Sequence, residues 1–114
     1  MAYYDIFAAP VPKARRDEYQ RFLERTHALM RAHGATEVVD LWGSDVPPGE
    51  RTSLPLAVAL EEGEEVAVGW TVWPSKEARD AGWAAMETAD MGEMPFDGAR
   101  MIFGGFSEAL VSRS

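Results

Sequence analysis

Short apolar runs alternate along the chain with two longer segments in which apolar residues recur at helical spacing. The short runs have the length and the aromatic and β-branched content of strands, and glycine, proline or polar residues bound them. Four strands are predicted in this way, at residues 3–9, 36–42, 65–73 and 99–111. We expect Pro10 and Pro12 to end the first strand, because proline cannot donate a hydrogen bond to a neighbouring strand.

The two helical segments lie between these strands. Residues 12–33 carry an apolar stripe at steps of three and four, and Gly34 follows as a natural helix terminator. Residues 76–88 predict the second helix, with Ser75 as its N-cap. The order β-α-β-β-α-β predicts one ferredoxin-like α+β domain over residues 1–114, an antiparallel sheet with both helices on one face.

Three further segments complete the pattern. Residues 43–53 predict a stiff polar loop that could act as a lid or clasp a partner subunit. Residues 54–60 are apolar, so an extra strand that pairs with residues 65–73 is one option. Gly104 and Gly105, inside the final predicted strand, indicate a bulge or a close backbone approach.

Charge and composition exclude several kinds of partner. Nineteen Asp and Glu oppose eleven Lys and Arg, a net charge of −8, so we expect no binding to nucleic acid or to an anionic membrane. With no cysteine, disulfides and thiolate chemistry are absent. The N-terminus lacks the basic start and apolar run of a signal peptide, and we expect a cytoplasmic protein.

The predicted sheet has an unpartnered face. Its strands are apolar on both faces, whereas the two helices can cover only one. A second copy of the chain is the simplest cover for the other face, so we expect a homodimer with two-fold symmetry.

Four blocks of sequence carry a family resemblance over nearly the whole chain. They are Tyr3-x-Asp5-x-Phe7 with Pro10-Val11-Pro12, His33-Gly34-Ala35, Asp45-Val46-Pro47-Pro48-Gly49 with Thr52-Ser53-Leu54-Pro55, and Met94-Pro95-Phe96-Asp97-Gly98-x-Arg100-Met101-Ile102-x-Gly104-Gly105-Phe106. The chain resembles the YbaA-like family, domain of unknown function 1428. The resemblance implies a dimeric α+β barrel and no established reaction. The chain departs from the family pattern at two places: the segment between the second predicted helix and Met94 is short, and that helix contains Gly82-Trp83.

Three residues are candidates for catalysis. Asp5 lies in an apolar strand and could be a general base; the structural alternative is a carboxylate that binds loop amides or an arginine. His33 ends the first helix and could transfer protons or contact a ligand, or simply cap free carbonyls. Arg100 could meet an oxyanion or carboxylate, or form a structural ion pair, for instance with Asp97.

The candidates for ligand binding are Asp40, Trp70, Met94 and Phe96. Aromatic and methionine side chains of this kind more often fill a core than line a ligand site. No cofactor or metal is expected. His27 and His33 lie about 120° apart around the helix, no cysteine is present, and no glycine-rich phosphate loop occurs.

Three functions therefore stay open. The leading hypothesis is a homodimer that binds a small hydrophobic or aromatic ligand in a pocket between sheet and helices. The first alternative is a cofactor-independent oxygenase, isomerase or lyase that uses Asp5 or His33. The second alternative is a non-catalytic regulatory or scaffold dimer.

Overall fold

Strands and helices alternate in the computed structural model, which describes residues 1–114. The main elements are β1 (Tyr3–Pro12), α1 (Arg16–Ala32), β2 (Glu37–Trp42), β3 (Glu64–Trp73), α3 (Lys76–Met86) and β4 (Ile102–Ser107). A short helix, α2 (Leu54–Ala57), precedes β3, and the 3₁₀ turns η1 (Lys13–Arg15) and η2 (Gly98–Arg100) precede α1 and β4.

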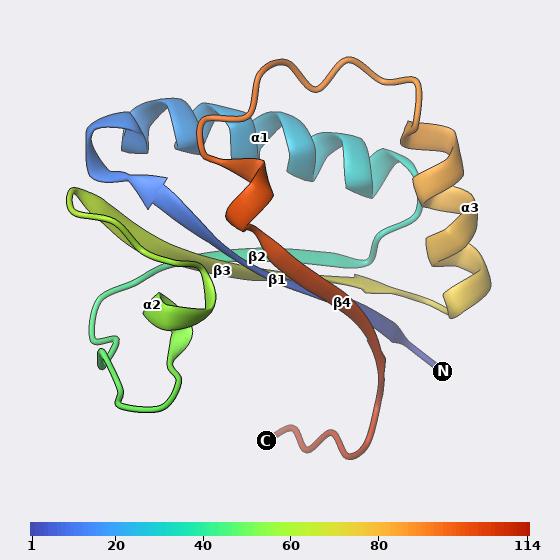
Figure 1. Ribbon diagram of the computed structural model, residues 1–114. Coiled ribbons are helices and arrows are strands. Elements are labelled where there is room, and N and C mark those ends of the chain that lie inside the picture. The colour runs from blue at the N-terminus through green and yellow to red at the C-terminus, as the bar shows by residue number, and fades with distance from the viewer.

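The four strands form one antiparallel sheet in the order β2-β3-β1-β4. Helices α1 and α3 lie on one face of this sheet, and α2 lies on the other side (Figure 1). This arrangement confirms the ferredoxin-like α+β fold predicted from the sequence. None of the helices combines the length and apolar character needed to cross a membrane.

The first strand runs through both prolines, so the prediction that it ends at residue 9 is wrong. Pro10 pairs with Val66 and Pro12 with Glu64 on β3, whereas β4 pairs only with residues 3–8 of β1. The amide of Lys13 donates to the carbonyl of Gly63, on the side of β3. Backbone N–H groups alternate between the two sides of a strand, so positions 10 and 12 face the opposite side, where β4 no longer pairs with β1. Proline is tolerated there because no neighbour needs its missing N–H.

The main core lies between α1 and the sheet. Tyr19 and Phe22 of α1 pack against Ala9 and Val11 of β1, and Phe96 from the segment after α3 closes the cluster. The Phe96 ring meets Tyr19 edge-on, with ring centroids 5.9 Å apart. The buried positions on α1 follow the stripe predicted from the sequence.

The apolar run at residues 54–60 is not a strand. Ser53 accepts a hydrogen bond from the amide of Leu56 and caps the single turn of α2, and Pro55 suits the first helical turn. We call the face of the sheet opposite α1 and α3 the second face. Val58, directly after α2, is fully buried against Ala8 and Val66 on this second face. Residues 54–60 thus pack against one end of the second face and cover it.

The final strand is shorter than the predicted 99–111. Asp97 accepts from the amide of Ala99 and starts η2, so β4 spans only Ile102–Ser107. Its register with β1 is continuous, and no bulge occurs at the two glycines. A Cβ on Gly105 would lie 2.5 Å from the Tyr3 hydroxyl, which makes this position the predicted close approach.

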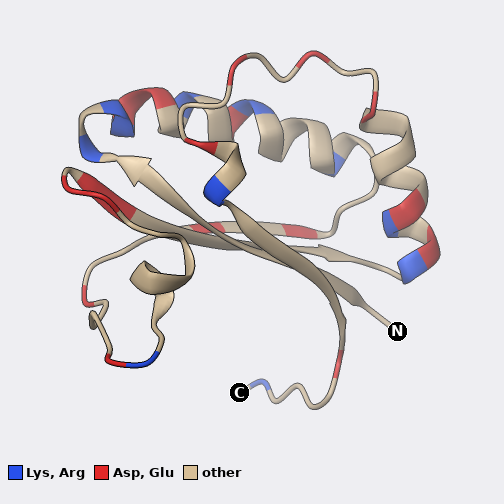
Figure 2. Cartoon of the chain, in the orientation of Figure 1, with Lys and Arg blue, Asp and Glu red and all other residues tan.

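The rest of the second face is largely apolar and exposed. Its exposed apolar side chains are Ile6, Leu41, Ile102 and Phe106, and Trp70, Val72 and Tyr4 lie half-buried in the same rows. Glu37, at the start of β2, is the exposed charged residue of this face. Figure 2 shows charged residues on α1, α3 and the connecting segments, and acidic residues on β2 and at the start of β3, whereas β4 carries no charge.

Candidate functional site

A buried carboxylate between α1 and β2 is left partly without a partner. Asp40 points from β2 toward α1, where its Oδ2 lies 2.5 Å from His27 Nε2. The Asp40 side chain is 7% exposed, and its other oxygen, Oδ1, is buried with no hydrogen-bond partner. The hydroxyl of Tyr19, on α1, is likewise buried and without a partner. Each of these two atoms calls for a specific explanation, because burial without a hydrogen bond is costly.

A glycine makes room for this carboxylate. Gly69 on β3 is the register partner of Asp40. A Cβ at this position would lie 2.5 Å from Asp40 Oδ1 and 2.5 Å from the Phe7 ring. Any larger residue would therefore displace the carboxylate or the ring.

A small cavity of about 70 Å³ adjoins the same residues. It is lined by Arg16, Tyr19, Gln20, Leu23, Asp40, Leu41 and Trp42. The guanidinium of Arg16 lies 4.7 Å from the centre of the Trp42 ring, so a positive charge is held beside the cavity by a cation–π contact. The lining thus combines an acceptor, a phenol, a cation and apolar walls.

Burial sets the protonation of the two buried groups. It raises the pKa of Asp40, and the hydrogen bond and charge of His27 oppose part of that shift. Burial, with the neighbouring charge of Asp40, also raises the pKa of Tyr19, so its phenol keeps its proton. Asp40 can therefore accept a proton or a hydrogen bond while Tyr19 donates one.

The carboxylate of Asp5 has a full set of partners. Its Oδ2 accepts from Trp73 Nε1 at 3.0 Å and from Trp83 Nε1 at 2.9 Å, and its Oδ1 accepts from Arg79 at 2.9 Å. These donors belong to β3 and α3, so Asp5 ties α3 to the sheet. The contact with Arg79 corresponds to the structural role that the sequence offers for Asp5, a carboxylate that binds an arginine.

Arg100 lies toward the other end of β1. Its guanidinium binds Glu64 at 2.7 Å and Asp97 at 2.9 Å, and Glu64 is the register partner of Pro12. The hydrogen bond from Arg100 lowers the pKa of Glu64. These contacts are the structural ion pairs considered from the sequence.

The structure does not bring the three candidate catalytic residues into one site. Asp5 and Arg100 bind different partners at different ends of β1. His33 is the C-cap of α1, and its carbonyl lies beside Gly82 of α3.

Of the four predicted ligand-binding residues, only Asp40 lines the cavity. Trp70 lies on the second face of the sheet, where its Nε1 donates to Glu37. Phe96 is part of the main core. Met94 is partly exposed and lies against Gly98.

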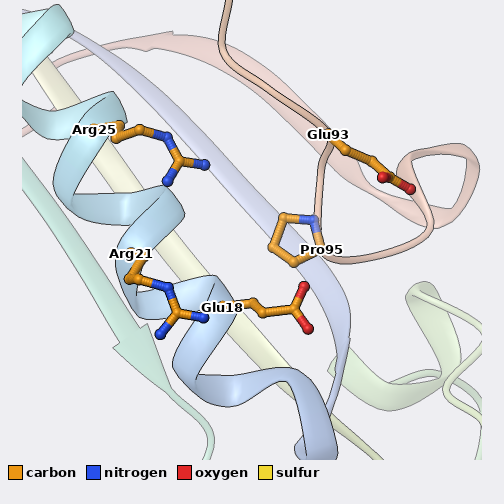
Figure 3. Close-up of a pocket in the computed structure, with 5 residues that line it drawn as sticks. All are labelled: Glu18, Arg21, Arg25, Glu93 and Pro95. Atoms are coloured by element: carbon orange, nitrogen blue, oxygen red, sulfur yellow. The ribbon is translucent and has the colours of Figure 1, made fainter.

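A second, larger hollow of about 210 Å³ is lined only by polar residues and proline. Glu18, Arg21 and Arg25 of α1 face Glu93 and Pro95 of the segment after α3 (Figure 3). Glu18 is already paired with Arg15 at 2.9 Å. This charged groove lies at the surface and offers no apolar wall, so it does not match the pocket expected from the sequence.

The sequence alone does not reveal that His27 binds Asp40 or that Tyr19 lines the same cavity. Tyr19 lies on the apolar stripe of the helix predicted at residues 12–33, and the spacing of His27 is informative only about metal binding. The available signal was Asp40 itself, a lone carboxylate on the strand face that carries Val38 and Trp42. No group of three or more His, Cys, Asp or Glu side chains has the arrangement of a metal site.

The fold and the cavity define a ferredoxin-like α+β protein with a partly unmatched carboxylate between helix and sheet. The chain belongs to the family described as "Protein of unknown function (DUF1428)", whose family model matches residues 2–98. It is 42% identical over 115 residues to "Uncharacterized protein YbaA" of Escherichia coli (strain K12), covering 96% of this chain and 98% of that protein. YbaA of Shigella flexneri matches to the same extent.

A solved structure supports the fold. The chain resembles a mutant of SnoaB, a cofactor-independent oxygenase from Streptomyces nogalater, with a TM-score of 0.64. The match covers 96% of this chain and 95% of that one at 13% sequence identity. At this identity the likeness concerns the fold alone.

Proposed function

We propose that the protein is a homodimer in which each protomer binds a small molecule at the cavity between α1 and β2. The observation that carries this proposal is the pair of buried polar atoms without partners, Asp40 Oδ1 and the Tyr19 hydroxyl. An unmatched buried polar group costs about 1–3 kcal/mol. A ligand that donates to Asp40 and bonds to Tyr19 recovers that free energy on binding.

The lining also defines the ligand's chemistry. Leu23 and Trp42 favour an apolar or aromatic body, and Asp40 favours a group that donates a hydrogen bond. Arg16 beside the cavity favours a ligand with an anionic group. A cavity of about 70 Å³ accommodates the polar end of such a molecule, while the apolar body extends toward the surface.

Two measures of size support a homodimer. One protomer exposes 7559 Å² of surface, roughly 1,300 Å² more than a compact monomer of its mass. Its radius of gyration is 14.8 Å, against about 13.3 Å for a compact chain of this length. A standard interface removes about 800 Å² from each partner, so the excess is enough for one.

The second face of the sheet is the surface that suits a second copy. Apart from Glu37 at the β2 edge, its exposed side chains are apolar, with Ile6 at 43% near the centre, and α2 covers only one end. Each protomer carries a net charge of −8, so two copies repel each other except through a face with little charge. Packing this face against its own copy meets both conditions.

The ligand proposal is tested by native mass spectrometry of the protein purified gently from its own host. We expect a fixed extra mass on the wild type that is lost in Tyr19→Phe and Asp40→Asn. Arg25→Ala is the matched control, because Arg25 lines the charged groove instead, and the adduct should stay. Loss of the adduct in Arg25→Ala alone would move the binding site to the groove. A wild type without adduct, and without a thermal shift in a fragment screen, would refute the ligand proposal and favour a scaffold.

The dimer is tested by sedimentation at micromolar concentration. The wild type should sediment at twice the protomer mass of 12.6 kDa. Ile6→Glu, on the second face, should give the protomer mass. Phe103→Glu is the matched control, because Phe103 is an exposed apolar residue on the helix side of β4, and it should stay dimeric. A monomeric wild type, or an Ile6→Glu variant that stays dimeric, would refute this interface.

A further inference from the structure

We propose that the Asp40–Tyr19 cavity catalyses proton exchange at a carbon next to a carbonyl group, with Asp40 as the base and Tyr19 as the donor to the carbonyl oxygen. The inference rests on the proposed ligand site and assigns a reaction to it. Its substrate class is a small 2-oxo acid with an apolar or aromatic body.

The two oxygens of Asp40 have separate surroundings. Oδ2 is bound by His27 Nε2, which fixes the plane of the carboxylate. Oδ1 is buried and unbound in the space that Gly69 leaves open, and Asp40 is one of the residues that line the cavity. A base needs one oxygen that is oriented yet free to take a proton, and Asp40 Oδ1 meets that description.

Tyr19 supplies the complementary group. Its hydroxyl is buried and unbound, and Tyr19 lines the same cavity as Asp40. A neutral phenol in a water-poor site stabilises charge that develops on an oxygen nearby. Arg16, held over Trp42, adds a positive charge for a carboxylate on the substrate.

The reaction balances without an added oxidant, metal or cofactor. The C–H bond next to the carbonyl breaks, its proton forms an O–H bond with Asp40 Oδ1, and its electron pair forms the C=C bond of an enolate. The carbonyl oxygen gains the negative charge and accepts a hydrogen bond from Tyr19. The proton on Asp40 Oδ1 exchanges with solvent, so in D₂O it becomes a deuteron. Return of that deuteron to the carbon restores the ketone and frees the Asp40 carboxylate, and the carbon acquires deuterium.

Phenylpyruvate is a suitable probe. It combines an acidic CH₂ next to a ketone, a carboxylate and an aromatic ring. Exchange of the CH₂ protons in D₂O is followed by loss of their ¹H NMR signal, and binding is measured in parallel by saturation-transfer difference.

We expect the wild type to accelerate exchange above the buffer rate. Asp40→Asn should reduce the catalysed rate by at least about 100-fold, and Tyr19→Phe by about 10-fold or more. Asp40→Asn keeps both lysines of the chain, Lys13 and Lys76, so it controls for exchange through imines. Arg25→Ala, in the charged groove, should keep the wild-type rate. Thermal melts of each variant establish that it is folded.

Each other outcome overturns a defined part of the inference. Binding of phenylpyruvate that Asp40→Asn weakens, without exchange by the wild type, leaves the ligand site standing and refutes catalysis. Exchange that persists in folded Asp40→Asn refutes Asp40 as the base. If phenylpyruvate neither binds nor exchanges, the substrate class is wrong, and an adduct in native mass spectrometry still tests the binding function separately.

Discussion

Replacing Asp5 by asparagine tests whether this carboxylate serves folding rather than chemistry. Trp73, Trp83 and Arg79 all donate to its two oxygens. An asparagine side chain keeps one acceptor oxygen and turns an NH₂ group toward one of these donors. A hydrogen bond is then lost and a buried donor is left unmatched.

The magnitude follows from the burial of the donors. Trp73 is 0% exposed, so its indole N–H has no access to water. A lost hydrogen bond to a charged group and an unmatched buried donor together destabilise by about 3 kcal/mol. The unfolding entropy of a chain of 114 residues is roughly 240 cal/mol/K, so the midpoint falls by about 12 °C.

Differential scanning calorimetry at neutral pH measures this change. Asp80→Asn is the matched control, because Asp80 also binds Arg79 but is half exposed, and its midpoint should stay within about 2 °C of the wild type. An Asp5→Asn midpoint equal to the wild type would refute the anchoring role. Such a result, with loss of a bound ligand or of activity, would return Asp5 to the candidate catalytic groups.

Three further predictions follow from the same contacts. Gly69→Ala should lower the melting midpoint by about 4–12 °C in calorimetry and weaken ligand binding, because its Cβ meets Asp40 Oδ1. Burial raises the pKa of Asp40, so the stability linked to this group is lost as pH rises through the raised pKa. Asp40→Asn should therefore melt no lower than the wild type at pH 7, and a fall of more than about 5 °C would make it a structural anchor. The bond from Arg100 holds the pKa of Glu64 below its usual 4.5, so its stabilisation is present above that value and lost as pH falls through the lower folded pKa. A melting series over acidic pH should thus show a flatter decline for Glu64→Gln than for the wild type.

Much of the fold could be predicted because the spacing of apolar residues along the chain indicates which side chains are buried. The stripe on α1 and the alternation in β3 are both properties of the local sequence. The predictions fail where the conformation of a segment depends on contacts with distant parts of the chain. Pro10 is acceptable in β1 only because β4 ends before it, and no local pattern reveals where a neighbouring strand stops.

The segment after residue 53 shows the opposite kind of error. Its apolar composition is typical of a strand, yet the hydroxyl of Ser53 caps a helical turn. One side chain-to-backbone hydrogen bond is enough to decide the conformation of so short a segment. The apolar residues are nevertheless used as composition predicts, since Val58 is buried against the sheet.

The candidate site could be predicted only in part, because sequence reveals a buried charge but not its partners. Asp5 and Asp40 look alike along the chain, each the one carboxylate on an otherwise apolar face of a short strand. In the structure Asp5 meets three donors, whereas Asp40 meets only His27 and keeps one oxygen unmatched. A buried carboxylate with every partner inside the chain stabilises the fold as it stands. A buried carboxylate that lacks a hydrogen-bond partner lowers the stability of the fold until a ligand supplies the missing hydrogen bond. For this reason we propose ligand recognition at Asp40 and structural anchoring at Asp5.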